Sequence, residues 1–244
     1  MALTFILASL IGLLPIVLWL IFFLWQDIKK PEPLHWIIIL FLLGALITPF
    51  VWVFENYLFT LLQIDTSQTL PFVVALFVYL LIAIIEELAK FFTAFLILKK
   101  NKYFDEAIDA MIYLIVLALG FSAIENILVS YQEITLGITF LPTLQLMSLR
   151  FIGANLLHAL SSGIIGFFWA LKLVRGRKEY VGIGLGLGIL LHWFFNLAII
   201  KTGGNAVFLI SLVLFTTCIF LLWAFDILKK IQKPIKYTTE IQKK

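Results

Sequence analysis

The chain has 244 residues, of which 63% are hydrophobic and only 13% are charged. Soluble domains usually carry about 25% charged residues, so this composition excludes a water-soluble globular fold, and it equally excludes a disordered chain. The single cysteine, Cys218, excludes a disulfide framework and a cysteine-rich metal ribbon. The net charge of +4 comes from Lys and Arg clusters between apolar runs, which is typical of membrane proteins rather than nucleic-acid-binding proteins.

Seven apolar runs are long enough to span a membrane as helices, and they leave no room for a separate soluble domain. The expected fold class is therefore all-α, a polytopic membrane helix bundle. The first run has no basic start and no cleavage site, so we expect it to be retained. The long fifth run is either one tilted helix or two pieces broken near Gly153. The predicted spans are 3–25, 34–54, 70–98, 108–130, 141–171, 181–200 and 206–225.

The distribution of basic residues predicts the orientation, because cytoplasmic connections carry an excess of Lys and Arg. Four segments on one side hold 15 of the 18 basic residues: 29–30, 99–102, 172–178 and 229–244. The N-terminus is therefore expected outside and the C-terminus in the cytoplasm. We expect an integral protein of the cytoplasmic membrane of a prokaryote.

Ionisable side chains inside the predicted spans point to the functional region, because each costs about 2.5–3.5 kcal/mol to insert at mid-membrane. The middle of the first, second and seventh runs contains none, so these runs read as lipid-facing scaffold. The four glycines at 182, 184, 186 and 188 of the sixth run read as a close-packing stripe. Away from the ends of the third to sixth runs, the acidic, basic and histidine residues are Glu86, Glu87, Lys90, Glu125, Arg150, His158 and His192.

Helical spacing places several of these polar side chains on shared faces. Glu86 and Lys90 are four residues apart, as are His192 and Asn196. Glu86 and Glu87 diverge by about 100° around the helix. One of the two carboxylates is therefore expected to face a central cavity, and the other a neighbouring helix.

The depths of the polar groups agree across the four spans. At about 1.5 Å per residue, Glu86, His158 and His192 lie roughly 18–20 Å from the predicted cytoplasmic ends of their spans. Glu125 and Asn196 lie roughly 24–25 Å from those ends. All of these groups are thus expected in one slab of the membrane.

Two histidines and three glutamates at one depth indicate chemistry on an activated water molecule. Either a carboxylate paired with a histidine serves as general base, or histidine and glutamate bind a divalent metal that lowers the pKa of its water. Asn196 or His192 is a candidate donor to a developing oxyanion. The chain lacks H-E-x-x-H, an intramembrane Asp pair and G-x-S-x-G, which argues against the zincin, aspartyl and nucleophile-elbow routes.

Four sequence blocks resemble the motifs of PrsW-type intramembrane proteases, over about residues 70–200. The wider superfamily of CAAX-processing and bacteriocin-associated proteases has related motifs. Lys90 stands one position before the arginine of that superfamily, and Glu125 stands where it has a histidine, so both departures favour the PrsW branch. The four blocks are E-E-x-x-K at 86–90, residues 104–109 with 120–126, Arg150 with 158–166, and H-x-x-x-N at 192–196.

The resemblance implies an endopeptidase that cleaves membrane proteins with a Glu/His-activated water. In the PrsW branch this implies first-site cleavage of an anti-sigma factor or a similar signalling protein. Zinc stays a possible cofactor, but the superfamily includes a metal-free glutamate mechanism, which we favour on sequence, with Glu86 as general base. The implied catalytic residues are Glu86, Glu87, Lys90, Glu125, His158, His192 and Asn196; the supporting or substrate-contacting residues are Phe121, Asn126 and Arg150; the ligands of any metal are Glu86, Glu125, His158 and His192.

We expect one integral membrane domain over residues 1–244. Residues 70–200 would form a catalytic four-helix core, 1–69 and 201–228 scaffold helices, and 229–244 a basic cytoplasmic tail. The expected partners are a transmembrane protein substrate and the lipid bilayer, not nucleic acid. Two alternatives stay open: a proton- or ion-coupled transporter that uses the same carboxylates, although no internal repeat supports it, and a non-catalytic scaffold.

Overall fold

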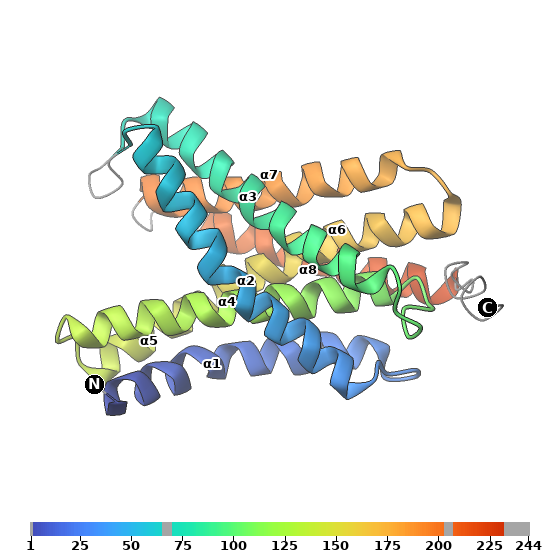
Figure 1. Ribbon diagram of the computed structural model, residues 1–244, viewed down its shortest axis with the longest axis horizontal. Helices are drawn as coiled ribbons and strands as arrows, with labels where there is room; N and C mark the ends of the chain where they lie inside the picture. The colour runs from blue at the N-terminus through green and yellow to red at the C-terminus, as the bar shows by residue number, and fades with distance from the viewer. Residues whose placement is uncertain (1, 65–69, 203–206, 232–244) are drawn as a thin grey trace.

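The computed structural model of the protein describes residues 2–64, 70–202 and 207–231, and within these ranges it contains helices and no strands (Figure 1). The long uncharged runs form the helices, and Pro33 and Pro71 directly precede two of them. Gly176, with a φ of 73°, ends another in the left-handed conformation. The elements are α1 (Ala2–Leu24), η1 (Trp25–Asp27), α2 (Leu34–Leu61), α3 (Phe72–Leu98), α4 (Asp109–Thr135), α5 (Phe140–Arg150), η2 (Phe151–Asn155), α6 (Leu156–Arg175), α7 (Glu179–Thr202) and α8 (Val207–Lys230).

Seven segments of the described chain are long and apolar enough to cross a membrane, which confirms the predicted seven-span, all-α fold. In Figure 1 the α1–α2, α3–α4 and α6–α7 connections and the end of α8 lie at one end of the bundle, and the start of α1 lies at the other. The Lys-rich connections thus share one end. Which end faces the cytoplasm stays a prediction. Of the predicted basic tail, residues 232–244 lie outside the described part of the chain.

The fifth predicted run is one span with an interruption. The chain from Phe140 to Arg175 is apolar enough to cross as a unit, but it changes from α to π geometry in η2 before it continues as α6. The indole N–H of Trp19 on α1 donates a hydrogen bond to the Phe151 carbonyl at 2.7 Å. A π turn loosens the regular backbone bonding, and a side chain from a neighbouring helix here supplies an extra donor.

Helix α4 forms the centre of the bundle, packed against α1, α2 and α6. Its backbone touches that of α2: a Cβ added at Gly44 would lie 1.9 Å from the Leu117 carbonyl oxygen, and one at Gly120 would lie 2.0 Å from that of Phe41. Only glycine permits this approach at the two positions. The contact fixes α4, and with it Glu125, against the outer helices.

Helix α2 is longer than predicted, ending at Leu61 rather than at residue 54. The predicted end at residue 54 therefore left out Glu55, an ionisable residue that lies inside α2, away from its middle, and is buried. The sequence pattern stopped the span before Glu55 and Asn56, since polar residues usually end an apolar run. In the folded protein the helix continues past them.

Candidate active site

Three side chains of α3 form the base of the candidate site. The ammonium of Lys90, which is fully buried, donates hydrogen bonds to Glu86 Oε2 at 3.2 Å and to Glu87 Oε1 at 2.8 Å. The predicted helical spacing of three and four residues produces both contacts. Because these ion pairs are buried away from water, loss of Lys90 would leave two carboxylates without a compensating charge.

Glu87 points toward α6 and α7, away from open space. Besides the bond from Lys90, it accepts hydrogen bonds from Ser161 at 3.1 Å, Ser162 at 3.2 Å and His192 Nδ1 at 2.8 Å. Glu86, in contrast, borders the cavity described below. The expectation that the two carboxylates diverge is thus confirmed, while the two serine donors were not predicted.

His158 on α6 connects Lys90 to Glu125 on α4. Its Nδ1 lies 2.9 Å from Lys90 Nζ, and its Nε2 lies 2.9 Å from Glu125 Oε2. Because an ammonium only donates, Nδ1 accepts and Nε2 carries the proton that is donated to Glu125. Arg150 donates to Glu125 at 3.4 Å and to Asn126 at 2.6 Å, so it belongs to this network.

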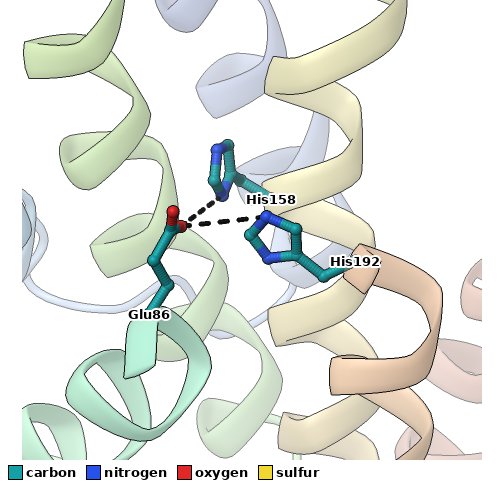
Figure 2. A group of neighbouring side chains, drawn as sticks. All are labelled: Glu86, His158 and His192. Atoms are coloured by element: carbon teal, nitrogen blue, oxygen red, sulfur yellow. Dashed lines mark ion pairs between the residues drawn. The ribbon is translucent and has the colours of Figure 1, made fainter. Parts of the chain in front are cut away.

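His192 on α7 is oriented by a carboxylate. Its Nδ1–H donates to Glu87, which leaves Nε2 facing Glu86 Oε2 at 3.9 Å. His158 Nδ1 lies at the same distance from that oxygen. Figure 2 shows both imidazole rings turned toward the Glu86 carboxylate from α6 and α7. A carboxylate behind a histidine is the usual support of a metal-binding imidazole.

Glu86, His158 and His192 each offer one ligand atom within 4.8 Å of the others, and all three residues are buried. Two histidines and one glutamate form a donor set typical of catalytic zinc, which leaves a fourth position for water. The residues present thus fit a metal ion. Two of these ligand atoms, on Glu86 and His158, also accept hydrogen bonds from Lys90. A bound metal ion would therefore compete with Lys90 for them, but it would not compete for the bond between Lys90 and Glu87.

A cavity of about 770 Å³ opens beside these groups, with walls that are otherwise largely apolar. Trp52 from α2, Leu149 from α5 and Leu214 from α8 are among its apolar wall residues. The polar residues that line it are Glu86, Glu125, Arg150, His158, His192 and Asn196, together with Tyr79, Gln132 and Ser211.

The other predicted residues take supporting positions. The Phe121 ring lies 4.5 Å from Lys90 Nζ and packs against His158. The Asn126 amide donates to the Gly12 carbonyl of α1 at 3.0 Å, which ties α4 to the outer helix. Sequence reasoning missed Glu55, whose Oε1 is buried with no hydrogen-bond partner among the described residues and which interacts electrostatically with Glu125 and Lys90.

Comparison with known proteins gives a family. Residues 32–224 match the PrsW family, described as "PrsW family intramembrane metalloprotease". The chain belongs to the PrsW family of intramembrane proteases. Proteins named Protease PrsW from Clostridioides difficile (strain 630), Geobacillus kaustophilus (strain HTA426) and Oceanobacillus iheyensis are 25%, 28% and 30% identical to it. The matches cover 95%, 76% and 69% of this chain and 93%, 76% and 72% of those relatives. No solved structure matches the chain significantly.

The PrsW membership confirms that the protein is an intramembrane protease. It does not favour the transporter alternative, since the matched family and the three relatives are all proteases. The relatives are bacterial, and with seven apolar spans they support an integral membrane protein in bacteria. The family description as a metalloprotease agrees with the possible metal-binding group at Glu86, His158 and His192.

Proposed function

We propose that this PrsW-family protein hydrolyses peptide bonds of membrane proteins at the Glu86–His158–His192 group and does so with a bound zinc ion. The observation that carries the proposal is the geometry of Figure 2: one carboxylate and two oriented imidazoles meet at the edge of a largely apolar cavity. Zinc bound there would polarise the scissile carbonyl and make its water acidic enough to supply hydroxide near neutral pH.

The proposed roles of this chain's residues follow from where each one lies. Glu86, His158 and His192 hold the metal, and Glu87 fixes His192 through the 2.8 Å bond to Nδ1. Glu125 is the remaining carboxylate on the cavity wall, with a side chain that is 25% exposed. It therefore takes the proton of the attacking water and returns it to the leaving amine.

Two further side chains of the cavity complete the proposed chemistry. Asn196 lines the same wall and is the candidate amide donor to the carbonyl oxygen as negative charge develops on it. Arg150 holds Glu125 from the α5 side. Lys90 stabilises Glu87 through the bond that a bound cation would leave intact, and it has no direct role in the bond change.

The sequence alone favoured a metal-free route with Glu86 as general base, and that route is the second candidate. In it the same carboxylate removes the proton from water, with no ligand role for the histidines. The family description and the His–His–Glu donor set support the metal-dependent route instead. Both routes require Glu86, so they differ in chelator sensitivity and not in the key residue.

The proposed substrate is a membrane-anchored regulatory protein, such as an anti-sigma factor, in the cytoplasmic membrane. The resemblance to the PrsW branch suggested this role, and the cavity adds support because its apolar walls suit an apolar peptide segment. A charged or folded soluble substrate would lose its hydration on entering such a site.

The test is cleavage of a panel of tagged single-span membrane proteins by the purified protein in liposomes. Glu86→Gln should lower the cleavage rate by at least about 100-fold, because it removes the anionic carboxylate but keeps its shape. Glu179→Gln is the matched control, since Glu179 is exposed at the start of α7. Undiminished cleavage by Glu86→Gln would refute the proposed site.

A further inference from the structure

A second group of carboxylates lies at the end of the bundle that holds the α1–α2 connection. Asp27 ends η1, Glu32 lies in the connection, and Asp109 begins α4. One carboxylate oxygen of each lies within 4.8 Å of those of the other two. Asp109 is about 24 Å along α4 from Glu125, so this group is separate from the candidate active site.

The donors already present leave part of this group unsatisfied. Asp109 Oδ2 accepts two backbone N–H bonds from the preceding connection, at 2.9 and 2.8 Å, and Glu32 Oε2 accepts the Tyr113 hydroxyl. Asp109 Oδ1 and Asp27 Oδ2 are buried and accept no hydrogen bond from an N–H or O–H group in the described part of the chain, although the Glu32 and Asp109 carboxyls are close enough to hydrogen-bond to each other when one of them is protonated. Asp27 is only 6% exposed, so water does not readily compensate for it.

The nearest cations are engaged with other carboxylates. Lys30 pairs with Asp105 at 2.9 Å and with Glu106 at 2.8 Å, and Lys229 pairs with Asp226 at 3.6 Å. In the described part of the chain, the three carboxylates of this group, which are buried or half-buried, thus have no ion pair of their own. Like charges at this separation repel strongly when they are shielded from water.

Burial raises the pKa of the Glu32 carboxyl, although the hydrogen bond from Tyr113 opposes the shift. The raised pKa has the sign expected of a carboxylate that lacks a compensating positive charge. Either a bound proton or a bound metal cation would compensate for this negative charge.

We propose that Asp27, Glu32 and Asp109 bind a hard divalent cation of the Mg²⁺/Ca²⁺ class. The group offers only oxygen donors, which such cations prefer, and no histidine or cysteine that would select zinc. One oxygen of each carboxylate would bind the cation. It would link the α1–α2 connection to the start of α4, the helix that carries Glu125 further along.

The experiment uses the purified full-length protein in detergent, stripped of metal and then given MgCl₂ or CaCl₂ separately. At about 100 times the dissociation constant, the favoured cation should raise the melting temperature by about 5 °C. Asp27→Asn and Asp109→Asn should each abolish the shift. Glu86→Gln and Glu179→Gln should keep it, because they lie outside the group.

A second readout does not depend on whether the Asn variants fold. Tb³⁺, an oxygen-seeking probe, should emit when the aromatic side chains of the protein are excited, because the Tyr113 hydroxyl bonds to Glu32, and the favoured cation should quench the emission by competition. No Tb³⁺ emission and no melting shift in the wild-type protein would overturn the proposal and leave a shared proton as the explanation. A shift that is lost in Glu86→Gln but kept in Asp27→Asn would overturn it too, by placing the cation at the other site.

Discussion

Glu86 and Glu87 show how two adjacent identical residues acquire different environments. Glu87 receives four hydrogen bonds and is locked between α3, α6 and α7, whereas Glu86 borders the cavity. The spacing of residues along a helix predicted this divergence. It could not predict Ser161 and Ser162 as donors to Glu87, because that depends on the rotation of α6 about its own axis.

The buried Lys90 gives a stability prediction at the same scale. Lys90→Met leaves Glu86 and Glu87 without their cation, so the free energy of unfolding should fall by about 3–5 kcal/mol. The double variant Glu87→Gln/Lys90→Met should recover part of that loss, because one uncompensated charge is gone. Denaturant unfolding in detergent measures both. A single variant within about 0.5 kcal/mol of the wild type would contradict the ion-pair network.

Arg150 and Glu55 mark the limit of sequence reasoning about single residues. Arg150 at the end of α5 could equally have snorkelled to the lipid headgroups, and only the fold shows that it pairs with Glu125 and Asn126. Glu55 directly follows an apolar run, so the sequence pattern indicated that the second span ends before it. The signal that could have found it is the apolar spacing that continues beyond it to Phe59 and Leu62.

At the scale of helices, close packing depends on glycines that the sequence identified only in part. Gly184 and Gly188 on α7 face α6, where an added Cβ would lie 2.7 Å from Phe168 Cβ and 2.7 Å from Ile165 Cγ1. A Cβ added at Gly182 or Gly186 would have no atom within 4 Å in the described part of the chain, apart from the backbone of its own helix. The predicted glycine stripe is confirmed on one face only. Gly120 was not identified as a packing residue, because a single glycine in an apolar run shows no spacing.

Gly120→Val tests the α2–α4 contact. Its side chain would meet the Phe41 carbonyl, which is backbone and cannot turn aside, so α2 would have to move. We expect a loss of about 3 kcal/mol or more in the free energy of unfolding, together with reduced cleavage activity. Gly186→Ala is the control and should change neither. If Gly120→Val had the stability of the wild type, the helices could not cross this closely.

At the scale of the whole molecule, the alternating direction of the seven spans and the distribution of Lys and Arg predict the same topology. The Lys-rich connections share one end of the bundle with the Asp27–Glu32–Asp109 group, and the α4–α5 connection lies at the other end (Figure 1). Sequence alone predicted the number of spans because hydropathy is local. It could not place the second carboxylate group, because Asp109 at the start of α4 lies far along the chain from Asp27 and Glu32.

Cysteine labelling tests the orientation, since Cys218 is the only native cysteine. In a Cys218→Ser background, Leu136→Cys should react with an impermeant reagent added to intact cells. Lys100→Cys should react only after the membrane is opened, because the Lys-rich end is expected to face the cytoplasm. Both positions are exposed, so accessibility alone does not separate them. The reverse pattern would invert the topology.

The most direct test of the proposed metal centre is to measure cleavage activity together with zinc content, before and after chelation. The wild-type protein should carry about one zinc ion per chain, lose cleavage with a chelator and regain it with added zinc. His192→Ala should lack both the metal and the activity, and Glu179→Gln should keep both. Full activity in chelated, zinc-free protein would contradict a metal centre at Glu86, His158 and His192, and would leave Glu86 as the base of a metal-free protease.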